Sequence, residues 1–170
     1  MSKIVHKEFH HKHLIEQQGK SKMLRIFFKY KRLLGKLCHA AVRTLLLYFQ
    51  AVTHTELFPW VGACIQTFGQ KINFHSHAHL LVTEGGKDYD GRFHHVSAFS
   101  DGLLAQMFAR EVFYLLLQKN LIFQSMVEKI MVWRYSGFSV HSKVKAPTKE
   151  EAEGVGDWGL AVASNKLYKR

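Results

Sequence analysis

Residues 61–86, VGACIQTFGQKINFHSHAHLLVTEGG, contain two strand-like runs joined by the short turn GQKI. In the second run histidine occupies every second position, at His75, His77 and His79, ahead of an apolar segment. Because successive side chains of a strand point to opposite faces, we expect the three imidazoles on one face and Ala78 and Leu80 on the other, in the core. The pattern therefore predicts strands with one apolar and one histidine-bearing face.

Hydrophobic periodicity predicts helices and further strands on either side of this pair. The turn-forming residues GGKDYDG predict a loop after the histidine strand, and Asp101 is a candidate N-cap for the helix that follows. Three successive strands with short turns indicate an antiparallel meander, so we expect an α+β fold whose antiparallel sheet carries the histidines and is flanked by helices. The predicted helices are 23–50, 101–120 and 124–135, and the further predicted strands are 92–99 and 138–146.

The composition favours a polyanionic partner. The 170-residue chain has 24 Lys plus Arg and 13 Asp plus Glu, a formal charge of +11, which suits nucleic acid first and an anionic membrane surface second. No apolar run is long enough to span a bilayer, and MSKIVHKEF lacks the apolar core of a signal peptide, so we expect a soluble, cytoplasmic protein. Cys38 and Cys64 lack CxxC spacing, which argues against a disulfide or a zinc ribbon.

The spacing of the histidines suits a divalent metal ion. On a strand, the Cα atoms of His77 and His79 lie about 7 Å apart. Two imidazoles at that separation can lean towards one ion and bind it at about 2.0–2.2 Å each. Alternating histidines on a half-exposed strand can also have no role, and spacing alone leaves both interpretations open. His94 and His95 are adjacent and point to opposite faces, which makes them weaker candidates.

Several segments together resemble one transposase family. IQTFGQKINFHSHAHLLVTEGG resembles the signature of the HUH-superfamily two-tyrosine transposases of rolling-circle insertion sequences (the insertion-sequence ninety-one type). In that family Gln-Thr-Phe-Gly leads into Asn-Phe-His-Pro-His-apolar-His and then a Gly-Gly loop. MLRIFFKYKRLLGKLCHAAVRTL, MFAREVFYLLLQKNLI and WRYSGFSVHSKVKA are similar to the family's other segments, so the resemblance covers residues 23–155.

The resemblance implies a transposase that nicks and transfers single DNA strands. His77 and His79 would hold Mg²⁺ or Mn²⁺ with a third polar ligand, for which Gln66 on the neighbouring strand and His75 on the same face are the candidates. In the family the ion polarises the scissile phosphate, and a tyrosine attacks it to form a phosphotyrosine link to DNA. The expected partner is DNA, as single-stranded transposon ends, and no membrane partner is expected.

The chain departs from the family pattern in three places. Ser76 replaces a proline and Ala78 a larger apolar residue, but neither would be a ligand. Before residue 23 the family's cysteine-rich zinc module and its first strand are not recognisable, so we expect one strand of the sheet to be missing. Trp158 follows KEEAEGVG where the family has its tyrosine, and Tyr168 lies in a tail without the Arg-Pro motif. Since tryptophan has no hydroxyl, no catalytic residue is assigned.

These departures indicate an inactive remnant that is truncated at both ends. The expected organisation is a divergent or disordered leader over 1–22, an incomplete HUH transposase-like domain over 23–156 and a divergent tail over 157–170. The alternatives are a DNA-binding module without catalysis, held to DNA by phosphate contacts, and an unstable fragment. The candidate DNA-binding residues are Lys29, Arg32, Lys36, Arg134, Lys143 and Lys145.

Overall fold

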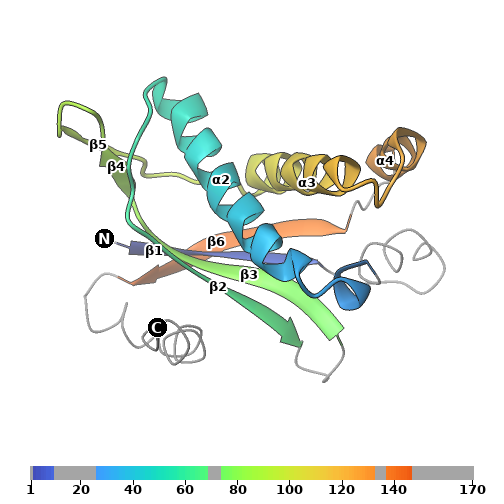
Figure 1. The fold of residues 1–170 in the computed structure, drawn as a ribbon. Coiled ribbons are helices and arrows are strands. Elements are labelled where there is room, and N and C mark those ends of the chain that lie inside the picture. Colours follow the sequence, from blue (N-terminus) through green and yellow to red (C-terminus); the bar gives the residue numbers. More distant parts are fainter. Residues whose placement is uncertain (1, 10–25, 69–73, 133–136, 147–170) are drawn as a thin grey trace, which may run out of the picture.

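A computed structural model of the chain describes residues 2–9, 26–68, 74–132 and 137–146. Within these residues, helices lie over one face of a four-stranded antiparallel sheet of order β2-β3-β1-β6, and β4 and β5 form a separate two-stranded sheet (Figure 1). The α+β class with an antiparallel sheet and flanking helices is therefore confirmed. The elements are β1 Ser2–Phe9, α2 Leu33–Thr53, β2 Val61–Phe68, β3 Phe74–Thr83, β4 Gly85–Lys87, β5 Phe93–His95, α3 Asp101–Gln118, α4 Gln124–Met131 and β6 Phe138–Ala146.

The strand β1 is the largest difference from the sequence-based prediction. It lies between β3 and β6 and is antiparallel to both, with Val5 opposite Leu80 and Ile4 opposite Val144. The sheet therefore has a strand before residue 23, where the sequence led us to expect one to be missing. The segment SKIVHKEF lacks a clean alternation, and strand formation depends strongly on neighbouring strands, which periodicity cannot reveal. Residues 10–22 lie outside the described residues.

The predicted meander is also wrong, because the chain leaves the main sheet after β3. Residues 85–87, expected to be loop, form β4, and only Phe93–His95 of the predicted strand 92–99 is extended, as β5 paired to β4. Gly85 has φ +125°, and a Cβ on Gly86 would lie 2.7 Å from the backbone nitrogen of Pro59. Two adjacent glycines thus permit both a sharp change of direction and close backbone packing.

The structure confirms the predicted starts of α3 at Asp101 and α4 at Gln124, but the first helix and the cap of α3 differ from the prediction. The predicted helix 23–50 is interrupted: residues 26–29 are helical, residues 31 and 32 form a turn, and α2 runs from Leu33 to Thr53. Ser100, and not Asp101, is the N-cap of α3, since its side chain accepts a hydrogen bond from the N–H of Leu103. Asp101 instead accepts hydrogen bonds from the N–H and hydroxyl of Ser142, which tie α3 to β6.

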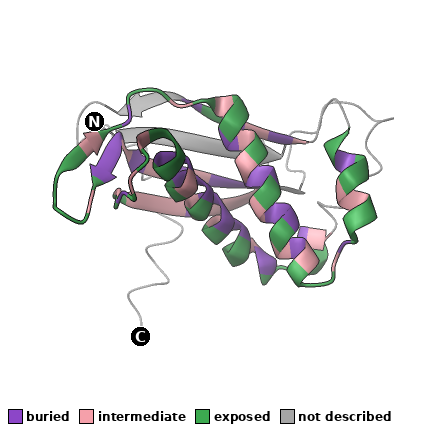
Figure 2. Ribbon diagram, turned by 90° about the horizontal axis from the view of Figure 1, so that it is seen from above, coloured by how far each residue is buried: buried purple, intermediate pink, exposed green. Residues whose placement is uncertain are grey.

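The core lies between the sheet and the helical layer (Figure 2). Ala78, Leu80 and Val82 of β3 are each 0% exposed, and they pack with fully buried residues of the helices such as Leu37 and Leu104. The predicted burial of Ala78 and Leu80 is thus confirmed. In the described part of the chain, no helix has the length and apolar character needed to cross a membrane.

Candidate functional site

His77 and His79 lie side by side on the face of β3 that points away from the helices. Their ring centroids are 4.7 Å apart with an interplanar angle of 62°. Ala78 between them is buried on the opposite face, and His77 itself is only 6% exposed. Two imidazoles are thus held next to each other on a rigid strand, as the alternation predicts.

Gln66 is the neighbour of His77 on the adjacent strand. The register of β2 and β3 places Gln66 directly opposite His77, and the distance from Oε1 of Gln66 to Nε2 of His77 is 3.2 Å. The structure therefore brings together three of the residues that the sequence marks as metal ligands. His75 also lies in β3, but its side chain is outside the described part of the chain.

The separation of these polar atoms fits a shared metal ion. Two ligand atoms bound to one ion at about 2.1 Å lie about 3.0 Å apart at right angles and about 3.4 Å apart at the tetrahedral angle. The 3.2 Å between Nε2 of His77 and Oε1 of Gln66 falls within this interval. An ion could therefore replace the hydrogen bond between them without a movement of the strands.

The side chains that could bind a metal ion here offer imidazole nitrogens and an amide oxygen. In the described ranges no group of three or more His, Cys, Asp and Glu side chains could hold a metal ion. A site here would consist of the imidazoles of His77 and His79 and the Gln66 amide, with other positions left to water or a phosphate oxygen. Such open coordination is typical of Mg²⁺ sites that also bind phosphate, and imidazole nitrogen suits transition metals.

Cys64 stands opposite His79 in the same register but has the character of a neutral thiol. Burial raises the pKa of the Cys64 thiol, and the backbone N–H of His79 opposes this only in part. Burial and the neighbouring Cys64 likewise raise the pKa of Cys38, and both cysteines are free. Because the thiolate is the form that binds metals, Cys64 is a poor additional ligand at neutral pH.

β1 adds a histidine position that sequence reasoning missed. His6 is the Cα partner of His79 on one side and of His141 on the other, so three histidine positions lie in one row across the sheet. His141 is exposed. Only strand pairing between distant parts of the chain creates this row, so no local pattern could have indicated it.

The candidate DNA-binding residues divide into two groups. Lys29, Arg32 and Lys36 are exposed and lie at or just before the beginning of α2. Lys143 and Lys145 lie in β6, but their side chains are outside the described residues. Arg134, the sixth DNA-binding candidate, lies outside the described residues, and so do Trp158, at the family's tyrosine position, and Tyr168.

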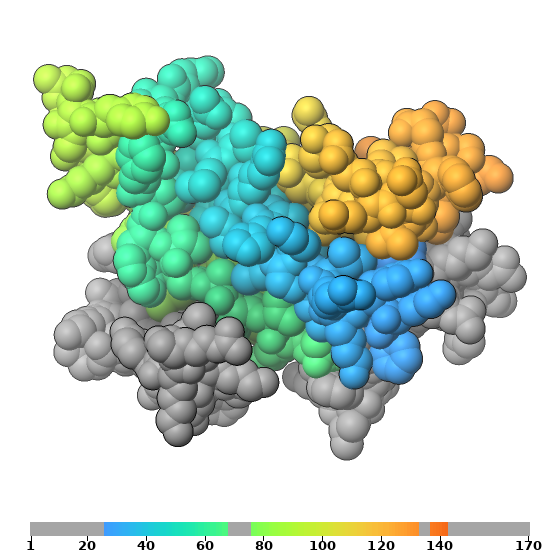
Figure 3. All heavy atoms as spheres, in the orientation of Figure 1, coloured from blue at the N-terminus to red at the C-terminus, as the bar shows by residue number. Residues whose placement is uncertain are grey.

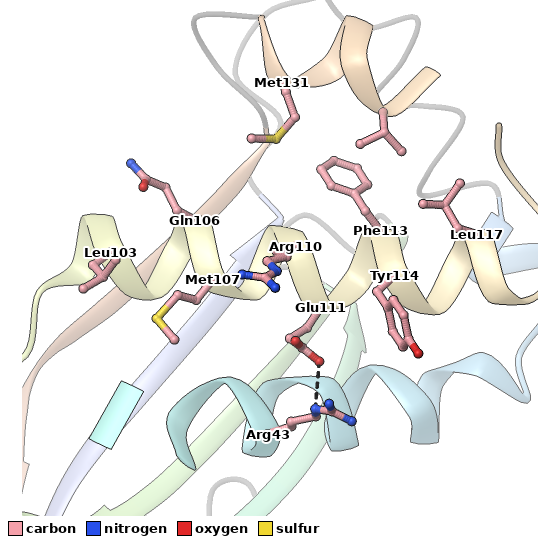
Figure 4. Close-up of a pocket in the computed structure, with 11 residues that line it drawn as sticks. Arg43, Leu103, Gln106, Met107, Arg110, Glu111, Phe113, Tyr114, Leu117 and Met131 are labelled. Carbon is pink, nitrogen blue, oxygen red and sulfur yellow. Dashed lines mark ion pairs between the residues drawn. The ribbon is translucent and has the colours of Figure 1, made fainter. Parts of the chain in front are cut away.

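A pocket lies in the helical layer, with α4 on one side of α3 and α2 on the other (Figure 4). It is a pocket of about 670 Å³. An ion pair of 3.2 Å joins Arg43 of α2 to Glu111 of α3 at its edge. The pocket is separate from the histidine face, since the helices cover the other side of the sheet. Its apolar lining includes Leu103, Met107, Phe113, Leu117, Val127 and Met131.

Comparison of the sequence with known protein families shows which family the chain belongs to. Residues 61–153, more than half of the chain, match the family described as "Putative transposase". The chain belongs to this transposase family. The matched segment runs from β2 through β6 and contains Gln66, His77 and His79. No curated protein and no solved structure matches the chain. Family membership supports a role in DNA transposition, with DNA as the partner.

Proposed function

We propose that this transposase-family chain is of the HUH, rolling-circle type, the type that transposes DNA by metal-dependent single-strand nicking and strand transfer. The observation that carries the proposal is the position of His77, His79 and Gln66. Two neighbouring imidazoles and an amide oxygen meet on two paired strands, within the segment that matches the family. The substrate would be single-stranded DNA at transposon ends.

In this proposal His77, His79 and Gln66 hold Mg²⁺ or Mn²⁺. When bound, such an ion acts as a Lewis acid that stabilises negative charge on phosphoryl oxygen. The chain's own contribution is orientation: His77 is almost completely buried, and Gln66 faces its Nε2 atom. Burial keeps the His77 ring in one position, and Gln66 is then a second ligand beside it.

We also propose that the chain is inactive in the covalent step. Trp158 stands where the resembled family has its nucleophilic tyrosine. A tyrosine hydroxyl can attack phosphorus when it is activated, whereas an indole has no oxygen to offer. The chain would thus retain metal and DNA binding without forming a phosphotyrosine link.

A non-catalytic DNA-binding module is the alternative function. The formal charge of +11 and the exposed Lys29, Arg32 and Lys36 favour it. Phosphate contacts alone would explain such binding, which would weaken steeply with salt. In this case the histidine pair would have no bound metal.

Metal titration and an adduct assay test the proposal. Calorimetric titration with Mn²⁺ should show a site that His77→Ala and His79→Ala each remove, while the exposed His39→Ala on α2 serves as the matched control. Absence of Mn²⁺ binding by the wild-type chain would contradict the proposed metal site and favour the non-catalytic DNA-binding module.

Incubation with Mn²⁺ and single-stranded oligonucleotides, followed by a denaturing gel, tests the covalent step. We expect DNA binding without a covalent protein–DNA adduct. An adduct that disappears in Tyr168→Phe would show that the chain is active and that Tyr168 replaces the family nucleophile.

A further inference from the structure

The beginning of the helical layer carries an unusual concentration of positive charge. Residues 26–55 include five basic residues and no acidic one. Four of the five lie within eight residues, and all four are exposed. Figure 3 shows residues 26–36 in blue at the surface of the molecule. The four are Lys29, Lys31, Arg32 and Lys36.

The local backbone explains why these side chains point outwards together. Phe27 is 0% exposed and Leu33 is 8% exposed, so the chain is anchored in the core at both ends of residues 28–32. Between these anchors the N–H of Leu33 donates to the carbonyl of Tyr30, and the N–H of Leu34 donates to that of Lys31. The turn leaves all five intervening side chains exposed.

Two aromatic rings stand among these cations. Phe28 is 60% exposed and Tyr30 is 39% exposed, and Nζ of Lys29 lies 5.3 Å from the centroid of the Tyr30 ring. Exposed aromatic rings within a basic surface are what sites for single-stranded nucleic acid use, because unpaired bases stack on them while Lys and Arg contact phosphates. A duplex hides the base faces and cannot stack in this way. A membrane-binding segment would need a continuous apolar face, which the sequence KYKR lacks.

This surface lies apart from the candidate metal site. α2 packs in the layer that covers Ala78 and Leu80, whereas His77 and His79 lie on the other face of the sheet. A phosphate held by Lys29 or Lys36 is therefore not the phosphate next to the histidine pair. The surface also lies outside the segment that matches the family, which begins at residue 61.

We propose that residues 28–36 form a second binding site, for single-stranded DNA that is not at the reacting position. Lys29, Lys31, Arg32 and Lys36 contact phosphates, and Phe28 and Tyr30 stack with bases. The inference rests on DNA being the partner, as the proposed function has it, but not on the histidine pair binding metal.

Salt-dependent binding tests the phosphate contacts. Fluorescence anisotropy with a short labelled oligothymidylate, in EDTA, gives the slope of log affinity against log salt. Replacing all four cations with Gln should lower this slope by up to about 3, from about 0.7 per contact on a single strand. The control is Lys119→Gln with Lys129→Gln, which removes exposed cations at the end of α3 and on α4 and should not change the slope. Circular dichroism confirms that each variant is folded.

Aromatic variants test the stacking. Phe28→Ala and Tyr30→Ala should each lower affinity for the oligothymidylate about tenfold and leave affinity for duplex DNA unchanged. Equal losses for single-stranded and duplex DNA would contradict stacking and overturn the proposal of a single-strand site.

Separate readouts distinguish this inference from the proposed function. The double variant His77→Ala, His79→Ala should lose Mn²⁺ binding and keep oligothymidylate binding in EDTA. Loss of that binding would show one shared site and overturn the inference.

If the four-Gln variant binds oligothymidylate like wild type, the inference fails while Mn²⁺ binding still tests the histidine pair. Binding to phosphatidylserine vesicles that the four-Gln variant loses, with oligothymidylate binding unchanged, would assign the surface to membranes instead.

Discussion

The two faces of β3 belong to the same ten residues but have different physical roles. On the helical side Ala78, Leu80 and Val82 are fully buried in an apolar core. On the other side His77 and His79 pack ring against ring, and His77 contacts the Gln66 amide. Burying a leucine contributes roughly 1.5–3 kcal/mol, whereas a typical hydrogen bond contributes about 1 kcal/mol net. We infer that the first face holds the fold together and the second is available for chemistry.

The largest effect should follow a change on the core face. Leu80→Ala should lower the free energy of unfolding by about 2–5 kcal/mol, because it leaves a cavity among fully buried side chains. Leu81 is the next residue, on the histidine face, and it is only partly buried. Leu81→Ala should therefore lower the free energy of unfolding by less. Denaturant unfolding measures both, and equal losses would break the distinction between the faces.

The next effect concerns metal binding and not stability. Gln66→Ala removes a proposed ligand, so it should weaken Mn²⁺ binding by at least the about 10–100-fold that loss of a contact to a ligand costs, and it should lower the free energy of unfolding by about 1 kcal/mol. Calorimetric titration gives the affinity. The matched control is Cys64→Ala, a neutral thiol on the same face of the same strand, which should bind Mn²⁺ like wild type. Unchanged affinity in Gln66→Ala would show that the amide is not a ligand.

A smaller effect should come from the polar atom on the core face. Ser76 is 0% exposed, and its hydroxyl has no hydrogen-bond partner among the residues that the structure describes. A buried hydroxyl without a partner costs about 1–3 kcal/mol, part of which is recovered when it is removed. Ser76→Ala should therefore raise the free energy of unfolding by about 1 kcal/mol, as measured by urea unfolding. A loss of stability would mean that the hydroxyl is paired.

The smallest effect concerns acid stability, which we assign to the β4–β5 hairpin. Oδ2 of Asp88 lies 2.6 Å from Nε2 of His94, and this hydrogen bond, with those from the backbone N–H groups of Arg92 and Asp90, lowers the pKa of the Asp88 carboxyl. A carboxyl whose pKa is lower in the folded chain contributes stability above its unfolded pKa and loses it as the pH falls through the folded value. The loss should therefore occur below about pH 4.

Unfolding curves between pH 3 and pH 7 check this assignment. Asp88→Asn should flatten the acid dependence, and Asp90→Asn, which replaces an exposed carboxylate in the same loop, should retain it. An unchanged acid dependence in Asp88→Asn would contradict the assignment to Asp88.

Much of the candidate site could be predicted from local sequence. The bounds of β2 match the predicted strand, and only five residues separate β2 from β3 in the sequence, so Gln66 can be expected near His77. Alternation likewise predicts that His77 and His79 share a face. These features depend only on strand geometry and a short connection, which residues adjacent in sequence specify.

Other features depended on pairing between distant segments. β1 lies between β3 and β6 although more than sixty residues separate it from either strand, and this places His6 beside His79 and His141. In the small β4–β5 sheet, the backbone of Gly86 packs closely against Pro59, which is far from β5 in the sequence. No periodicity within SKIVHKEF or GGKDYDG encodes such contacts.

The sequence by itself determined the α+β class, the two faces of β3, the positive charge and the resemblance to a transposase family. Tertiary structure alone decided the strand order, the row of His6, His79 and His141, and the separation of residues 28–36 from the histidine face. The physical reason is the distance in sequence over which each feature is set. Alternation and composition depend on residues that are near one another in the chain. Strand order and the position of a site depend on which distant segments pack together.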